Sequence, residues 1–122
     1  MSTMIPILGG LMPKILPVRL TTTGRTDIFT PNVGTGNTRN TVVCVTCSNE
    51  TAGAVNILIE YFDGVSNYYL FRRPVPANDT VFFSDHPVVL LKTHKITATA
   101  GSANAITVAL AVMQDSGASG GG

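Results

Sequence analysis

Tryptophan is absent from this chain of 122 residues, and charged residues make up only 12% of it. A soluble domain usually has about twice that share of charged residues. Disordered chains combine few apolar residues with high charge, so the 44% of apolar residues excludes that class. The 8 basic and 7 acidic residues nearly cancel, which excludes a strongly basic nucleic-acid-binding protein. So few charges leave a largely neutral surface, which is typical of proteins that are covered by partners.

Long apolar runs are also missing. No stretch approaches the ~18 consecutive apolar residues of a membrane-spanning helix, so we expect no membrane partner. The apolar start of the chain lacks the basic residues of a secretion signal, and Pro6 and the Gly9-Gly10 pair interrupt it. We therefore expect a chain that does not use a signal of this kind.

Cysteine occurs only twice, as Cys44 and Cys47. A CxxC pair is found in redox motifs and forms half of many zinc sites. The surrounding residues 41–47 are rich in β-branched side chains and predict a strand, on which residues three apart point to opposite faces. We therefore expect two free thiols and no need for an oxidising compartment.

Helical periodicity is absent as well. Short runs rich in Thr and Val alternate with clusters of Gly, Pro, Asn and Asp. This pattern predicts an all-β protein with a single antiparallel β-sandwich, of jelly-roll or immunoglobulin-like type. The expected strands cover residues 16–23, 26–30, 41–48, 55–62, 66–72, 79–84, 87–91, 95–100 and 105–113.

Alternation within the strands assigns their faces. The expected core positions are Val55, Ile57, Ile59, Tyr61, Ile96, Ala98, Ile106, Val108, Leu110 and Val112. The opposite faces of the last two strands carry Thr97, Thr99, Thr107 and Ala109, which are small and uncharged. These four residues are candidate contacts with another subunit, although a neutral face exposed to solvent would have the same composition.

Two terminal segments differ from the strands. Residues 1–15 are expected to form an extended N-terminal arm, because prolines disfavour a helix there. Residues 16–115 then form the sandwich domain, and residues 116–122 form a Gly/Ser-rich tail. We expect the arm to lie on a neighbouring subunit, and its deletion to leave the stability of the sandwich unchanged. Its candidate contact residues are Met4, Ile5, Ile7, Leu8, Leu11 and Met12.

No arrangement of residues predicts catalysis. Ser84-Asp85-His86 has the composition of a catalytic triad, but triad residues converge from separate elements. Asn49-Glu50-Thr51 fits the N-glycosylation pattern, but without a secretion signal we expect no glycan. We predict no catalytic residues, no metal and no cofactor, and a small enzyme is the least favoured hypothesis.

Aromatic and basic side chains cluster around residues 66–73. Tyr68, Arg72 and Arg73 are candidates for the rim of an interface, where Tyr and Arg are enriched. Alternation places Tyr69 and Phe71 on one face and Tyr68 on the other. An alternative hypothesis is a carbohydrate-binding module for host attachment, with Tyr68 as its exposed aromatic platform.

The order of these elements resembles a known group of proteins. The segments that carry the resemblance are the arm, VVCVTCSNET at 42–51, VNILI at 55–59, YLF at 69–71, VPANDT at 75–80, VVLL at 88–91, KITA at 95–98 and ITVALAV at 106–112. This pattern is similar to that of small β-sandwich proteins of tailed-bacteriophage virions, which are capsid decoration (cement) proteins or neck and tail components.

The resemblance implies a non-enzymatic structural protein, most directly a capsid decoration protein that binds and stabilises the major capsid shell. A neck or tail adaptor is the alternative within the same class. The implied partners are the major capsid protein or another virion protein, together with other copies of the chain in a homo-oligomer. The implied location is the virion, after assembly in the host cytoplasm.

Overall fold

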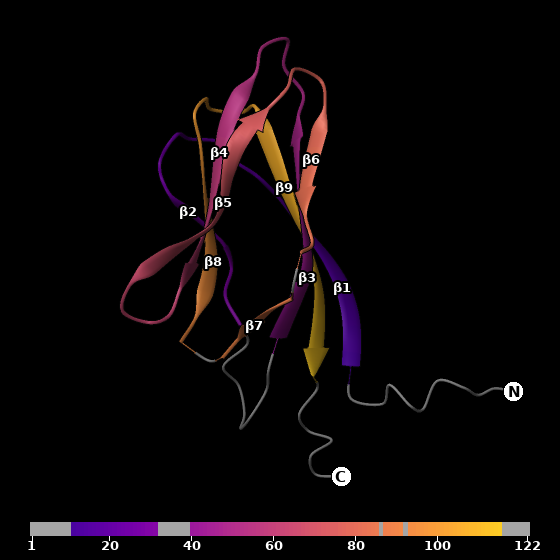
Figure 1. Ribbon diagram of the computed structural model, residues 1–122, viewed down its shortest axis with the longest axis vertical. Coiled ribbons are helices and arrows are strands. Elements are labelled where there is room, and N and C mark those ends of the chain that lie inside the picture. Colours follow the sequence, from indigo (N-terminus) through magenta and orange to yellow (C-terminus); the bar gives the residue numbers. More distant parts are fainter. Residues whose placement is uncertain (1–10, 32–39, 86, 92, 116–122) are drawn as a thin grey trace, which may run out of the picture.

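The computed structural model describes residues 11–31, 40–85, 87–91 and 93–115, and Figure 1 shows two β-sheets lying face to face. No helix occurs among these residues. The strands are β1 (Leu11–Arg19), β2 (Thr26–Phe29), β3 (Asn40–Asn49), β4 (Val55–Phe62), β5 (Asn67–Val75), β6 (Thr80–Phe83), β7 (Val88–Leu90), β8 (Lys95–Ala100) and β9 (Ile106–Asp115). The predicted all-β sandwich is confirmed.

The strands pair in a nested order. β1 pairs with β9, β2 with β8, β3 with β6 and β7, and β4 with β5, and every pair is antiparallel. These pairs amount to one long ribbon that folds over into two sheets. Sheet A has the order β1-β9-β3-β6, with β7 also on β3, and sheet B has the order β2-β8-β4-β5. Nested pairing of this kind is the arrangement of a jelly roll, so the structure selects that type of sandwich.

Aliphatic side chains fill the space between the sheets. In β9 every second residue from Ile106 to Val112 is buried, and Ile57 and Ile59 of β4 meet them from the other sheet. Burying a side chain of this size contributes about 1.5–3 kcal/mol. The core positions predicted by alternation are confirmed in these strands, with Tyr61 half-buried at the margin.

A β-bulge in β3 lets two core residues stand three positions apart. The register of β3 with β9 shifts between Val42 and Cys44. Val42 and Val45 both enter the core as a result, and Val43 and Cys44 lie between them on the outer side. Strict alternation would have turned one of the two valines outward.

A second bulge lies in β5. Phe71 pairs with Ile59 and Tyr69 pairs with Glu60, which leaves Leu70 as the extra residue. Phe71 therefore turns toward the core, while Tyr69 is exposed on the outer face of sheet B. The prediction that Tyr69 and Phe71 share a face is wrong for this reason.

Both cysteines are free, as predicted. Cys47 is buried in the core, whereas Cys44 is half-buried on the other side of β3. No bulge separates the two residues, so alternation holds them on opposite faces. Burial raises the pKa of the Cys47 thiol to about 12, so this thiol stays protonated near neutral pH.

Alkylation is expected to distinguish the two thiols. Only a thiolate reacts readily with iodoacetamide, and the Cys47 thiolate is both inaccessible and disfavoured. Mass spectrometry without reductant should therefore show one modification on the folded protein, at Cys44, and two after denaturation. A protein that takes up no label in either state would contradict the absence of a disulfide.

A buried asparagine joins the turn after β3 to the loop after β5. Asn49 is 2% exposed, and its Nδ2 donates to the carbonyl oxygens of Gly53 (2.8 Å) and Val75 (3.0 Å). Its Oδ1 accepts from the backbone N–H and from the hydroxyl of Thr51, at 2.9 and 2.7 Å. One side chain thus holds two connections together at this end of the sandwich.

The first strand begins at Leu11, five positions before its expected start at residue 16. Residues 11–15 pair with β9 of the same chain, from Leu11 opposite Asp115 to Ile15 opposite Ala111. β1 lies at the edge of sheet A, where Pro13 and Pro17 are tolerated although they lack an N–H donor. These five residues therefore belong to the sandwich, and their removal would shorten β1.

Candidate functional site

Among the side chains that the structure describes, those on the outer face of sheet A are almost free of charge. This face consists of the side chains of β1, β3, β6, β7 and β9 that point away from the core. We call the following residues the neutral face: Ile15, Pro17, Thr41, Val43, Cys44, Thr46, Ser48, Thr80, Phe82, Val89, Thr107, Ala109, Ala111 and Met113. At one end the neutral face is bounded by Arg19, whose guanidinium lies 3.0 Å from the Glu50 carboxylate.

A strip of small side chains runs along the middle of the neutral face. Ala109 of β9 lies opposite Thr46 of β3, and Ala111 follows it along the strand. Apolar side chains stand on both sides of this strip. Ile15 of β1 is 68% exposed and Phe82 of β6 is 61% exposed. The neutral face is therefore a shallow apolar groove, with small side chains along its middle and larger ones on both sides, into which another protein surface can pack.

Three of the five hydroxyl groups of the neutral face have partners within the sheet. The hydroxyl of Thr46 donates to the backbone carbonyl of Ala109 at 3.1 Å. The hydroxyls of Ser48 and Thr80 lie 2.9 Å apart and hydrogen-bond to each other. Covering the face would therefore leave these three groups satisfied, which keeps the cost of removing water low.

The outer face of sheet B has the opposite character. Arg25 hydrogen-bonds the carboxylate of Glu60 at 3.0 Å, and Lys95 lies 3.0 Å from that of Asp27. Arg72 of β5 is also on this face, in register with Leu58 of β4. The side chains of Arg25, Lys95 and Asp27 are 31–53% exposed, whereas Glu60 is nearly buried, so this face keeps hydrated charges at its surface.

The predicted contact residues on β8 and β9 divide between the two faces. Thr107 and Ala109 belong to the neutral face, each half-buried. Thr99 lies on the outer face of sheet B, also half-buried. Thr97 is 1% exposed and lies in register with Glu60 and Asp27, so it offers no surface to a partner. The prediction of Thr97 as a contact residue is wrong, because neighbouring side chains cover it.

The predicted arm lies mostly outside the described residues. Met4, Ile5, Ile7 and Leu8 fall outside them. Leu11 and Met12 belong to β1 and pair with β9 of their own chain. Their assignment to an arm that leaves the sandwich is therefore corrected.

The aromatic and basic cluster is arranged differently from the prediction. Tyr68 is 53% exposed and lies opposite Tyr61. Arg72 instead contacts Tyr69, with its Cζ 5.1 Å from the ring centroid and Nη1 donating to the hydroxyl at 3.3 Å. Arg73 is exposed at the edge strand of sheet B. Sequence reasoning missed the pair of Tyr69 and Arg72 because the bulge in β5 places residues three apart on one face.

Side chains suited to catalysis or metal binding do not converge in the described residues. No group of three or more His, Cys, Asp or Glu side chains there is placed to hold a metal ion. His94 accepts hydrogen bonds at Nδ1 from the Tyr61 hydroxyl (2.7 Å) and the Leu91 N–H (3.2 Å), which gives it a structural role in the loop before β8. Within the described ranges, no helix has the length and apolar character needed to cross a membrane.

Comparison with known proteins gives structural similarities only. No family model and no curated protein sequence matches the chain. A protein of the Bacillus endospore appendages, described as disulfide-linked pili, has 15% identity and a TM-score of 0.48, with 85% of each chain covered. A pentameric capsid protein from metagenomic phage sequences has 18% identity and a TM-score of 0.43, with 84% of this chain and 63% of that one covered. A chain of the virus-like particle of the giant freshwater prawn Macrobrachium rosenbergii extra small virus has 12% identity and a TM-score of 0.41, with 93% of this chain and 81% of that one covered.

Proposed function

We propose that this chain is a non-enzymatic structural protein that assembles through the neutral face of sheet A. The outer face of sheet B stays exposed to solvent in the assembly. The observation that carries this proposal is the contrast between the two outer faces. Sheet A presents small and apolar side chains, with three hydroxyls already hydrogen-bonded, whereas sheet B presents charged side chains in ion pairs. An apolar face on a small domain is favourably removed from water, while removing water from exposed charged groups brings little gain.

Assembly through this face is tested on the purified chain. Sedimentation velocity over a range of concentrations should show species larger than the monomer, and negative-stain images should show regular particles. Addition of moderate salt is expected to leave the assembly intact, because its main contact is apolar rather than ionic. A strictly monomeric chain at all concentrations would leave self-assembly without support and point to a different partner for the neutral face.

The finer proposal is a virion protein of a tailed phage, most directly a capsid decoration protein and alternatively a neck or tail adaptor. It follows from the strand order and turn residues that resemble such proteins. Many identical copies in a symmetric particle make small neutral contacts sum to a stable attachment. Electron microscopy of native particles that contain the chain, with its copy number per particle, tests the proposal and separates the shell from the neck and tail.

Deletion of residues 1–10 is expected to weaken assembly and to leave the sandwich folded. This segment contains Met4, Ile5, Ile7 and Leu8, and an apolar side chain of this size gains about 1.5–3 kcal/mol on burial. We propose that these side chains are buried against a neighbouring copy of the chain. The deletion ends before Leu11, so β1 keeps its pairing with β9.

The midpoint of thermal unfolding for the monomeric fraction and the assembly constant are the two quantities to measure. We expect the midpoint to change by less than about 4 °C, which corresponds to less than 1 kcal/mol, and assembly to weaken by about tenfold or more. A large fall in the midpoint would show that the segment packs on its own sandwich.

A further inference from the structure

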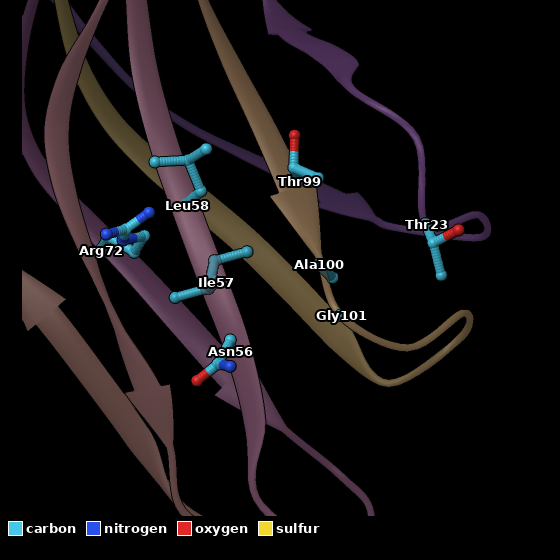
Figure 2. Close-up of a pocket in the computed structure, with 8 residues that line it drawn as sticks. All are labelled: Thr23, Asn56, Ile57, Leu58, Arg72, Thr99, Ala100 and Gly101. Carbon is cyan, nitrogen blue, oxygen red and sulfur yellow. The ribbon is translucent and has the colours of Figure 1, made fainter.

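A pocket of about 300 Å³ opens on the outer face of sheet B. Figure 2 shows the side chains that surround it: Asn56 and Leu58 from β4, Arg72 from β5, Thr99 from β8, and Thr23 from the loop before β2. Its volume is at the lower end of the range for small-molecule sites. The pocket belongs to the sheet that the proposed assembly leaves uncovered.

The floor of the pocket is apolar and its border is polar. Leu58 lies in register between Arg72 on one neighbouring strand and Thr99 on the other, so its half-buried side chain forms the floor. Thr99, Thr23 and Asn56 provide hydroxyl and amide groups around it. Such a site fits a molecule with one C–H face and several hydroxyl groups, which is the chemistry of a sugar ring.

Arg72 adds a positive charge without an acidic partner in the described residues. The ion pairs there use Arg19, Arg25 and Lys95. The Glu60 carboxylate on the same face is bound by Arg25 and is therefore unavailable. The Arg72 guanidinium makes one hydrogen bond, from Nη1 to the hydroxyl of Tyr69, and keeps further N–H donors. A guanidinium with free donors recognises a carboxylate by paired, charge-assisted hydrogen bonds.

Tyr69 fixes the position of this guanidinium. Its ring lies 5.1 Å from Arg72 Cζ and is itself 60% exposed. Stacking on an aromatic ring restricts the rotamers of an arginine, and less entropy is then lost when an anion binds. The bulge in β5 is what places both residues on the same face, so the arrangement is built into the fold.

We infer that this pocket binds a carboxylated sugar, a hexuronic acid residue of an acidic polysaccharide. The carboxylate pairs with Arg72, the C–H face of the ring lies on Leu58, and the hydroxyls bond Thr23, Asn56 or Thr99. The inference goes beyond the proposed assembly function and does not depend on it. In an assembled particle, many copies of such a site would bind the polysaccharide with combined strength.

The test is calorimetric titration of the whole chain with oligosaccharides of galacturonate, alginate and hyaluronate, each beside its carboxyl-reduced form. We expect at least one uronate oligosaccharide to bind with a dissociation constant in the millimolar range or below. Its carboxyl-reduced form should bind at least about tenfold more weakly. Arg72→Gln should cause a similar loss, and Thr99→Phe should block the pocket. Arg73→Gln is the matched control, since it removes the same charge one residue away and does not line the pocket.

Three results would overturn the inference. They are the absence of binding by any of the three uronate oligosaccharides, an equal loss of affinity in Arg72→Gln and Arg73→Gln, and tighter binding of a glutamate-rich peptide than of any uronate. The last result would assign the pocket to an acidic protein segment. Sedimentation velocity of Arg72→Gln should show the same assembly as the native chain. A loss of sugar binding in this variant is then distinguished from a loss of assembly.

Discussion

Replacing Asn49 with alanine is expected to cause the largest loss of stability of any single polar substitution in the described sandwich. The change removes five hydrogen bonds and leaves the carbonyl of Val75 and the N–H of Thr51 without their side-chain partner. A buried polar group that loses its partner costs about 1–3 kcal/mol, so the total loss is about 3–5 kcal/mol. That is a large share of the roughly 5–15 kcal/mol that stabilises a typical domain.

Equilibrium unfolding in guanidinium chloride measures this effect, and Asn56→Ala provides the control because the Asn56 side chain is exposed. We expect less than about 0.5 kcal/mol for the control. Asn49→Asp keeps the acceptor for Thr51 but loses the donor to Gly53 and Val75, and should be destabilising as well. A loss below about 1 kcal/mol in Asn49→Ala would show that water replaces the amide and that the two connections are held by other contacts.

Placing a lysine at Ala109 is expected to abolish assembly at concentrations where the native chain assembles. Ala109 lies in the middle of the neutral face, between Pro17 and Thr46. An ammonium group covered there would lose its water without gaining a carboxylate, at a cost of several kcal/mol. We expect the assembly constant to fall by about a hundredfold or more.

The control is a lysine on the other side of the sandwich. Thr107→Lys and Thr99→Lys make the same substitution on two half-buried strand positions, one on the neutral face and one on the outer face of sheet B. Thr107→Lys should weaken assembly, and Thr99→Lys should leave it unchanged. All three variants should remain folded, since such substitutions usually change stability little. Assembly that survives Ala109→Lys and Thr107→Lys would show that the neutral face is solvent-exposed in the native protein.

The sequence predicts the strands well because their signals are local. The β-branched runs, the Gly and Asn turns and the alternating core residues lie in nearly every expected place, and β9 from Ile106 to Val112 is the clearest case. Between the two sandwich types the sequence left the choice open, because nested pairing such as β1 with β9 is a long-range property.

The features that sequence reasoning missed arise from departures from simple alternation. The bulges in β3 and β5 each add one residue, and no residue type at Val43 or Leu70 signals this. The predicted arm extends to Ile15 because prolines disfavour a helix in residues 1–15, yet an edge strand accommodates Pro13 and Pro17. Asn49 did carry a signal. An Asn followed two residues later by Thr at the end of a strand is typical of a side-chain-capped turn, which here is a better explanation than a glycosylation pattern.

The two prolines of β1 also bear on how the chain avoids uncontrolled polymerisation. An open strand edge invites the same strand of another molecule to add to the sheet, and repeated addition produces amyloid-like fibrils. β1 pairs only with β9 among the described strands, so its other side is such an edge. Pro13 and Pro17 offer no N–H to an incoming strand, which interrupts the hydrogen-bond ladder twice within nine residues. With so few charges, the protein has little electrostatic repulsion between its molecules, and the two prolines instead protect this edge from fibril formation. Association is thereby directed to side-chain surfaces, where assemblies can close and stop growing.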